Sequence, residues 1–261
     1  MPVPGVIKSC LPLNTLKSLR YDDVEDYYMA STDTLTRRIS GLEGLGDLKV
    51  VRVIEKQDTE ARLRPWQRKS YFNVELPSKS LLFRAYEELE TRNHLNHSSK
   101  LKDLTVHLVD VEGNPLMVFN RPYRSDTAID GDQLKTSSPG RSTFCYDDHG
   151  RLAGIIKQVD HQLRHNFEVY DGNSELQYFI QGPSFAKRLL QFSAEFEIKN
   201  SGKSRRVGWI NKKFSGWLKQ LLEDEEDFVL VFPTDANLQM RAILIGVTFL
   251  IAHVCYHADS A

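Results

Sequence analysis

The sequence predicts a mainly β fold, in which twelve antiparallel strands form a barrel around a hydrophobic C-terminal helix. Three observations predict it. Short apolar or alternating runs recur between turn residues from Gly41 onward. Several of the joins between these runs have hairpin chemistry. One segment near the C-terminus is apolar on every helical face, which is typical of a buried helix.

The predicted strands alternate between polar and apolar residues, so each has one buried face and one wet face. In one of them, Phe167 and Val169 alternate with Glu168 and Tyr170. The twelve runs lie near residues 49–54, 69–75, 80–86, 104–109, 115–120, 142–146, 152–158, 165–170, 175–181, 192–198, 205–211 and 228–232.

Three joins carry turn residues in a pattern that predicts tight hairpins. Segments 112–115, 147–150 and 171–173 each combine a residue whose side chain can cap its own backbone with a glycine, namely Gly113, Gly150 and Gly172. Glycine tolerates the positive φ that such turns require. The sequence therefore predicts antiparallel neighbours at these joins.

Residues 242–252 contain no charged side chain and are bracketed by Arg241 and His253. The apolar character continues through His253 to Tyr256. A helix over 242–256 would span roughly 22 Å, which is short of the roughly 30 Å hydrocarbon thickness of a bilayer. This length favours a helix inside the barrel over the alternative, a transmembrane span.

A second, amphipathic helix is predicted over residues 215–225, with apolar side chains at helical spacing such as Trp217 and Leu221, and Ser215 as its N-cap. Acidic residues follow at its C-terminal end, where the helix dipole disfavours them. A bound cation would compensate for that placement.

The composition limits the classes of function. The 261 residues include 34 Lys+Arg and 35 Asp+Glu, so the near-zero net charge excludes nucleic-acid binding through the whole surface, and no specific nucleic acid is expected as a partner. Three dispersed cysteines provide neither a disulfide framework nor a CxxC motif. No secretion signal is recognisable, and residues 1–40 are expected to be a polar, mobile leader before a single domain at 41–261.

The last third of the chain carries a distinctive order of features. It reads VGWINKKF, then a short amphipathic segment, then DEEDFVLVFPTD, then the apolar run with its internal Gly246. This order resembles the phospholipid scramblase family. The resemblance continues upstream through segments 150–158, 167–171 and 178–183, the turn at 121–124, and segments 71–90 and 41–43.

The resemblance implies a tubby-like fold, in which twelve strands close around a central C-terminal helix. It also implies calcium-dependent, ATP-independent, bidirectional movement of phospholipids between membrane leaflets, which is transport rather than covalent catalysis. The expected location is the cytosolic face of a membrane, most naturally the plasma membrane, with a nuclear or cytosolic pool as well.

The calcium segment of the family maps onto residues 224–235. Carboxylate oxygens are the ligands that calcium prefers, and the expected ligands here are Asp224, Glu226, Asp227 and Asp235. Residues 228–232 offer only backbone carbonyls, which a barrel strand would engage in its own ladder. The segment also lacks the glycine of an EF-hand loop. The alternative interpretation is a solvated acidic loop.

A basic and aromatic stretch precedes this segment. Lysines and arginines attract anionic lipid head groups, and tryptophan prefers the membrane interface. The predicted lipid-binding residues are Lys203, Arg205, Arg206, Lys212, Lys213 and Trp217. The alternative interpretation is a buried tryptophan beside the wet face of a strand.

The adjacent cysteines that carry palmitate in the family are absent here. Cys145 or Cys10 could each take at most one acyl chain, and stable anchoring needs two signals. No nucleophile motif or paired acids indicate an enzyme. The rival interpretation is a tubby-like adaptor without transport activity, which would bind anionic lipids or protein partners, or associate with itself.

Overall fold

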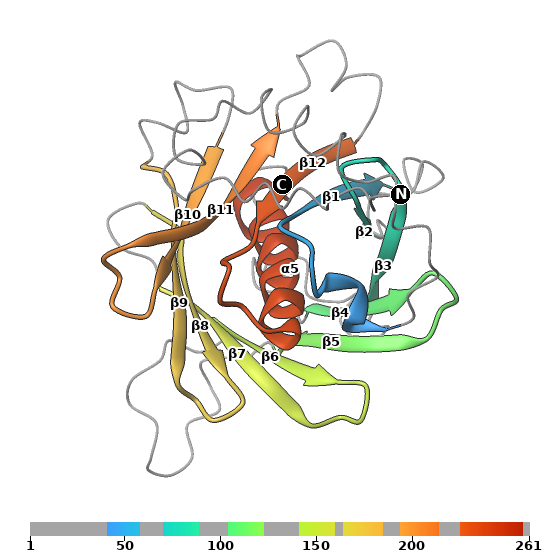
Figure 1. Cartoon of the computed structure of the whole chain (residues 1–261), viewed down its shortest axis with the longest axis horizontal. Coiled ribbons are helices and arrows are strands. Elements are labelled where there is room, and N and C mark those ends of the chain that lie inside the picture. The colour runs from blue at the N-terminus through green and yellow to red at the C-terminus, as the bar shows by residue number, and fades with distance from the viewer. Residues whose placement is uncertain are drawn as a thin grey trace, which may run out of the picture. The chain divides into compact units, whose positions relative to one another are not determined.

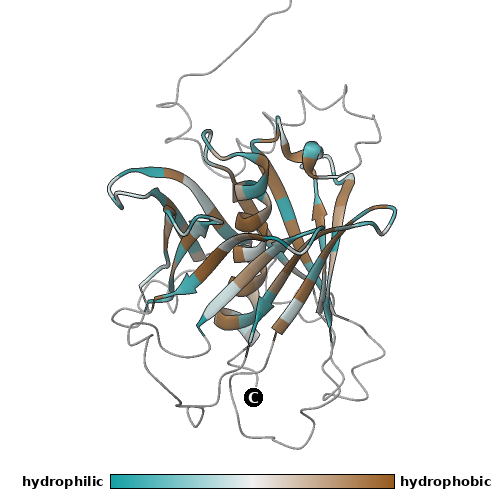
Figure 2. Ribbon diagram, turned by 90° about the horizontal axis from the view of Figure 1, so that it is seen from below, coloured by the Kyte–Doolittle hydropathy of each residue, from teal (hydrophilic) through white to brown (hydrophobic). Residues whose placement is uncertain are grey.

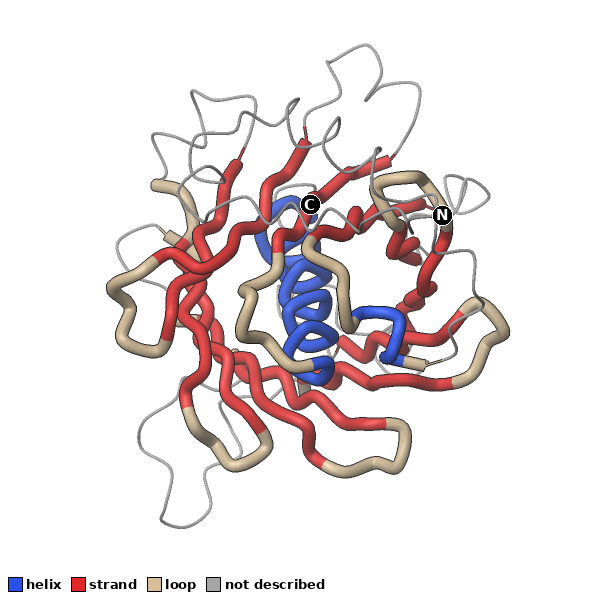
Figure 3. Tube along the Cα trace, viewed as in Figure 1, coloured by secondary structure: helices blue, strands red, loops and turns tan. Residues whose placement is uncertain are grey.

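The structure of the protein, a computed structural model, describes residues 41–57, 70–88, 104–122, 141–159, 164–184, 194–213 and 225–257. Their strands form one closed antiparallel barrel with a helix along its axis (Figure 1, Figure 3). The predicted helix at 215–225 lies outside the described residues apart from Glu225, and so does the predicted leader, whose boundary at residue 41 stays a prediction.

Each strand pairs with its neighbours in sequence, and β1 closes the barrel on β12, so the predicted twelve-stranded barrel is confirmed. All twelve predicted runs overlap a strand, because the alternation that predicts them also places one face against the interior. The strands are β1 Val50–Gln57, β2 Ser70–Glu75, β3 Leu81–Glu88, β4 Leu104–Asp110, β5 Pro115–Arg121, β6 Ser142–Asp147, β7 Leu152–Gln158, β8 Asn166–Asp171, β9 Leu176–Gln181, β10 Ala194–Asn200, β11 Arg206–Lys213 and β12 Glu225–Val231.

The hairpins repeat one local device. The Oδ1 atom of Asp110 accepts hydrogen bonds from the backbone N–H groups two and four residues later, at 2.9 and 2.8 Å. Asp147 and Asp171 do the same in the β6–β7 and β8–β9 hairpins. The third residue after each aspartate has positive φ, at Gly113, Gly150 and Ser174. The sequence-based placement of this position at Gly172 in the third hairpin was therefore wrong.

The two ends of the barrel differ. Because the strands are antiparallel and sequential, the β2–β3, β4–β5, β6–β7, β8–β9 and β10–β11 hairpins all lie at one end, which we call the hairpin end. The short 3₁₀ helix η1, Leu42–Leu45, and the start of the central helix lie at this end too. The central helix finishes at the opposite end, which we call the C-terminal end (Figure 2).

The central helix α5, Leu238–Ala252, is buried on nearly every face and continues as a π-helical turn, His253–His257. It begins one turn earlier than the sequence predicted, because the side chain of Asn237 accepts a hydrogen bond from Met240 N at 2.8 Å and caps it. The apolar segment Leu238–Tyr256 is long enough to cross a membrane, at about 28 Å. Most of it lies buried within the described barrel.

Helix α5 lies directly against the barrel wall at Gly246. A Cβ atom built there would lie 2.1 Å from a ring carbon of Phe119 on β5. The Phe119 ring also meets Phe249 edge-on, with ring centroids 5.8 Å apart. The interior is therefore filled by direct contact between helix and strand at this point.

Replacing Gly246 with alanine should destabilise the protein by about 1–3 kcal/mol, because the added methyl group has no space beside Phe119. Urea unfolding would measure this. Gly202→Ala is the matched control, since a Cβ at that exposed hairpin position lies 3.7 Å from its nearest neighbour. Adding Phe119→Leu to Gly246→Ala should restore part of the loss; a strictly additive double variant would contradict the steric explanation.

Candidate membrane-interaction site

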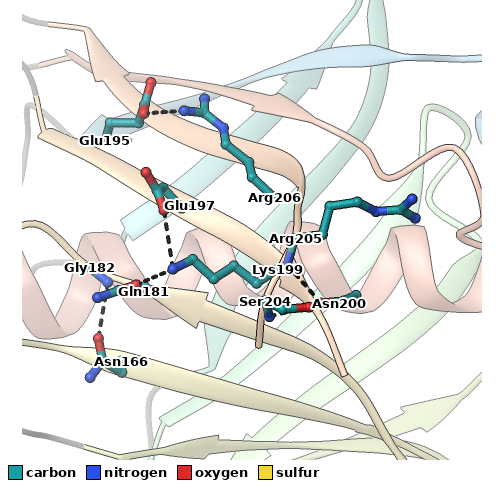
Figure 4. A network of polar contacts seen from close by, with 10 residues as sticks. All are labelled: Asn166, Gln181, Gly182, Glu195, Glu197, Lys199, Asn200, Ser204, Arg205 and Arg206. Carbon is teal, nitrogen blue, oxygen red and sulfur yellow. Dashed lines mark hydrogen bonds and ion pairs between the residues drawn. The ribbon is translucent and has the colours of Figure 1, made fainter. Parts of the chain in front are cut away.

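The β10–β11 hairpin presents basic side chains on the outer wall, and Figure 4 shows three of them, Lys199, Arg205 and Arg206. Together with Lys203 in the turn, we call them the basic hairpin patch. Asn200 shapes the turn, since its Oδ1 atom accepts hydrogen bonds from Ser204 N at 3.2 Å and Arg205 N at 3.1 Å. Lys203 occupies the turn position with positive φ. The patch therefore stands on a hydrogen-bonded hairpin.

Lys203 connects this hairpin to the neighbouring strands. Its Nζ atom lies 2.7 Å from Glu168 Oε1 on β8 and 4.6 Å from the ring centroid of Phe179 on β9. Glu168 also accepts a hydrogen bond from the Tyr170 hydroxyl at 2.7 Å, and Lys157 lies over the Tyr170 ring. Burial and the hydrogen bond to Glu168 raise the pKa of Tyr170 to about 12.

The other cations of the patch differ in their pairing. Arg206 pairs with Glu195 at 2.7 Å, and Lys199 lies 3.5 Å from Glu197. Arg205 is exposed and has no ion-pair partner within the described residues. Figure 4 shows the Arg205 side chain pointing away from the carboxylates of Glu195 and Glu197, so among the described cations of this hairpin it is exposed without a carboxylate partner.

Lys212, expected on the same surface, lies inside the barrel. Its side chain is 3% exposed, and its Nζ atom lies 3.5 Å from the ring centroid of Tyr256 in the C-terminal turn. The reason is the strand period: Gly208 and Ile210 face inward on β11, so Lys212 does as well. The expectation that Lys212 contacts lipid from the surface was therefore wrong. Lys213 ends β11, and Trp217 lies outside the described residues.

Two of the four predicted calcium ligands lie in β12. Glu226 and Asp227 lie in the strand ladder opposite β1, so the alternative of an acidic loop is wrong for these two residues. Asp227 pairs with Arg52 on β1 at 2.6 Å. Asp235 lies beyond the hairpin end of the strand, where it accepts a hydrogen bond from Tyr178 at 3.1 Å.

The structure does not bring Asp235 together with Glu226 and Asp227. From Asp227 to the end of β12 alone the chain rises about 13 Å. Among the described residues no group of three His, Cys, Asp or Glu side chains is placed to hold a metal ion. Asp224 lies outside those residues, so the calcium site stays a prediction.

Cys145 does not fit the expected acylation site. Its thiol faces the interior with no exposed surface, and burial raises its pKa. A thiol in that position cannot meet an acyl donor while the barrel is folded. Cys10 lies outside the described residues.

Arg241 has a role that sequence reasoning had not assigned. It is buried at the start of α5, where its guanidinium donates to the carbonyl oxygens of Ala236 at 2.9 Å and Leu45 at 2.7 Å, and to that of Leu48. Burial lowers its pKa. Arg241 thus fastens α5 to η1 and to the chain entering the helix, which we call the Arg241 clamp. A single arginine in an apolar helix was the available indication.

Comparison with known proteins identifies the family of this chain. A family model described as Scramblase matches residues 33–258. The chain belongs to the scramblase family. It is similar to human phospholipid scramblase 2, at 22% identity over 83% of this chain and 70% of the relative, and to human phospholipid scramblase 1, at 23% identity over 85% and 67%. Human phospholipid scramblase family member 5 is 21% identical over 80% and 74%.

These matches support a phospholipid scramblase-like function and association with phospholipid membranes. The chain spans 62% of the length of the mouse phospholipid scramblase 1 that it matches. Among solved structures, a protein from Arabidopsis thaliana aligns with a TM-score of 0.40 and 10% identity over 77% of this chain and 91% of its own.

The ion pair between Lys203 and Glu168 should show in the titration of Glu168. Partial burial raises the pKa of this carboxyl, but the hydrogen bonds from Lys203 and Tyr170 outweigh it, so the pKa lies below its usual range. A lowered pKa stabilises the fold above the unfolded value of about 4.3. That contribution is lost as pH falls through the lowered value. Carbon-13 NMR should find the low pKa, and Lys203→Gln should raise it; an unchanged value would contradict the pairing.

Removing the Arg241 clamp should destabilise the barrel. Arg241→Met keeps the aliphatic stem but leaves the Leu45 and Leu48 carbonyls without their donor, at a cost of about 2–4 kcal/mol in unfolding free energy. Arg205→Met is the control, since Arg205 is exposed. Urea unfolding gives the loss, and hydrogen exchange should show faster exchange across η1. Equal losses for both variants would count against the clamp.

Proposed function

We propose that this protein moves phospholipids in both directions between the leaflets of a membrane, without ATP and in response to calcium. We place it at the cytosolic face, most naturally of the plasma membrane, and assign it transport rather than covalent chemistry. One observation carries the proposal beyond the names of its relatives: a helix of nearly bilayer-spanning length, apolar on every face, is stored inside the barrel.

A lipid head group needs a polar path through the hydrocarbon. The interior of the described barrel is occupied by α5, which touches the wall at Phe119, so a single closed barrel has no room for that path. Transport therefore requires that α5 leaves the barrel for the bilayer, or that several copies assemble there.

Leaving the barrel has defined local costs at both ends of the helix. At the hairpin end, the Arg241 clamp must open and its guanidinium must find other acceptors. At the C-terminal end, Tyr256 must move away from the Lys212 ammonium. The apolar face of α5 itself can exchange barrel contacts for lipid, which is also apolar.

The basic hairpin patch supports attachment to anionic lipids. Each lysine or arginine near a negatively charged bilayer contributes about 1 kcal/mol to binding. Arg205 is available as the structure stands, whereas Lys203 and Arg206 would exchange a carboxylate for a lipid phosphate. Binding at this patch should therefore weaken with salt.

We propose Asp224, Glu226 and Asp227 as ligands of one calcium ion. Asp235 is proposed as a ligand at a second position, because it lies apart from Glu226 and Asp227. Calcium at Asp227 has to compete with the Arg52 guanidinium, 2.6 Å away, so weak affinity is expected.

A second candidate function is a non-transporting adaptor that binds anionic lipids or protein partners. The Arg241 clamp favours it, because three carbonyl partners hold α5 inside the barrel. The two functions differ in one respect: a transporter has to change state at the membrane, whereas an adaptor keeps its helix buried.

Accessibility of head-group-labelled lipid in reconstituted proteoliposomes, without ATP and with or without calcium, should separate them. We expect calcium to expose inner-leaflet lipid, Asp224→Asn/Glu226→Gln to abolish that response, and Arg241→Met to raise the basal rate by loosening α5. Asp235→Asn tests the fourth proposed ligand. Its control is Tyr178→Phe, which removes the hydrogen bond between Tyr178 and Asp235 but keeps the carboxylate. No exposure despite verified reconstitution would support the adaptor.

A further inference from the structure

The outer wall of β2, β3 and β4 carries a row of three aromatic rings. Tyr71 on β2 lies opposite Tyr86 on β3, and Tyr86 lies opposite His107 on β4. Tyr71 is 41% exposed and Tyr86 is 47% exposed, while their inward neighbours Phe72 and Ala85 are buried. The rings therefore belong to the wet face of the sheet and not to the core, where alternation would place a tyrosine that serves packing.

These rings are held in place. The Tyr86 ring stacks on the His107 ring, with centroids 5.1 Å apart and an interplanar angle of 15°. His107 Nε2 lies 2.9 Å from Glu88 Oε2, and the Glu88 side chain is 60% exposed. Glu88 thus fixes the histidine and keeps most of its carboxylate surface open to solvent.

Charge is ordered along β3 beside this row. Arg84, Tyr86 and Glu88 share the outer face, each about 7 Å from the next along the strand. Arg84 is exposed and has no ion-pair partner in the ranges the structure describes. One strand therefore presents a cation, an aromatic ring and an anion in sequence.

That order is complementary to a zwitterion. A quaternary ammonium group has no N–H to donate, so its favourable protein partners are aromatic faces and a nearby carboxylate. A phosphate is recognised by a guanidinium. We propose that Arg84, Tyr86 and Glu88, with Tyr71 and His107, form a binding surface for the phosphocholine head groups of a bilayer, with the ammonium over the tyrosines beside Glu88 and the phosphate at Arg84.

The two exposed tyrosines of this phosphocholine surface suit a bilayer, because tyrosine side chains prefer the membrane interface. The inference rests on the proposed membrane association but uses different residues from the basic hairpin patch. Strands β12 and β1 separate the two surfaces in the barrel. Uncharged and anionic membranes should therefore engage them independently.

Co-sedimentation with vesicles of phosphatidylcholine alone, compared with vesicles of phosphatidylglycerol alone, tests this. Tyr71→Ala/Tyr86→Ala should bind phosphatidylcholine vesicles roughly tenfold more weakly, since each cation–π contact is of modest strength. Binding to phosphatidylglycerol should not change. Tyr71→Phe/Tyr86→Phe keeps both ring faces and should bind as the wild type does. Val111→Ala/Leu152→Ala removes the other exposed large apolar side chains of the described residues and is the matched control.

Arg84→Gln and Arg205→Gln should show opposite selectivity. The first should weaken binding to phosphatidylcholine, and the second should weaken binding to phosphatidylglycerol. In the wild type, soluble phosphocholine should shift the NMR signals of the Tyr71 and Tyr86 rings. This measurement does not depend on whether a variant folds correctly.

Several outcomes would overturn the inference: no binding of the wild type to phosphatidylcholine, unchanged binding of the double alanine variant, or equal losses on both vesicle types. Equal losses would assign the row to a general contact surface or to a protein partner. Absence of lipid scrambling alongside selective phosphatidylcholine binding would reject the transport function and keep this surface.

Discussion

The requirement that the barrel be filled governs this structure. Twelve strands enclose more space than their own inward side chains occupy, and α5 fills the remainder with side chains on every face. The contact at Gly246 shows how little tolerance remains, because even one methyl group would overlap Phe119. The helix is apolar all round for this reason, and the same property gives it the composition of a membrane span.

Most of the fold was predictable because it follows from local rules. Strand period and hairpin chemistry depend on neighbouring residues, and both were read correctly except at Ser174, where a residue other than glycine takes positive φ. The placement of charged groups was less predictable. Lys212 and Lys213 are adjacent in a basic run, yet the strand period sends Lys212 into the interior. The Arg241 clamp joins residues nearly two hundred positions apart, which no sequence window contains.

Charge on the barrel is divided between its wall and its ends. On the wall, cations of the basic hairpin patch are partly neutralised by Glu168, Glu195 and Glu197, so the patch keeps a positive excess without a large repulsive energy. On the other side of β12 and β1, the phosphocholine surface carries little net charge, and its proposed binding depends on aromatic ring faces instead. The two proposed lipid-binding surfaces therefore depend on different chemistry, namely charge at one and aromatic ring faces at the other.

Two buried charged side chains, Arg241 and Lys212, lie at opposite ends of α5, and this decides where a trigger could act. Along its middle, the helix packs mainly into the hydrophobic core, and lipid can replace those apolar contacts with little net change in free energy. At its ends, Arg241 donates to buried carbonyls and Lys212 lies against Tyr256, and neither interaction has an equivalent in hydrocarbon. A bound ligand would therefore favour release of α5 from the barrel only if it weakens the interactions at one of these ends. Asp227 lies within β12, a strand that α5 contacts, whereas Asp235 lies between β12 and the start of α5. A cation bound at Asp235 would therefore act next to Ala236, whose carbonyl belongs to the Arg241 clamp.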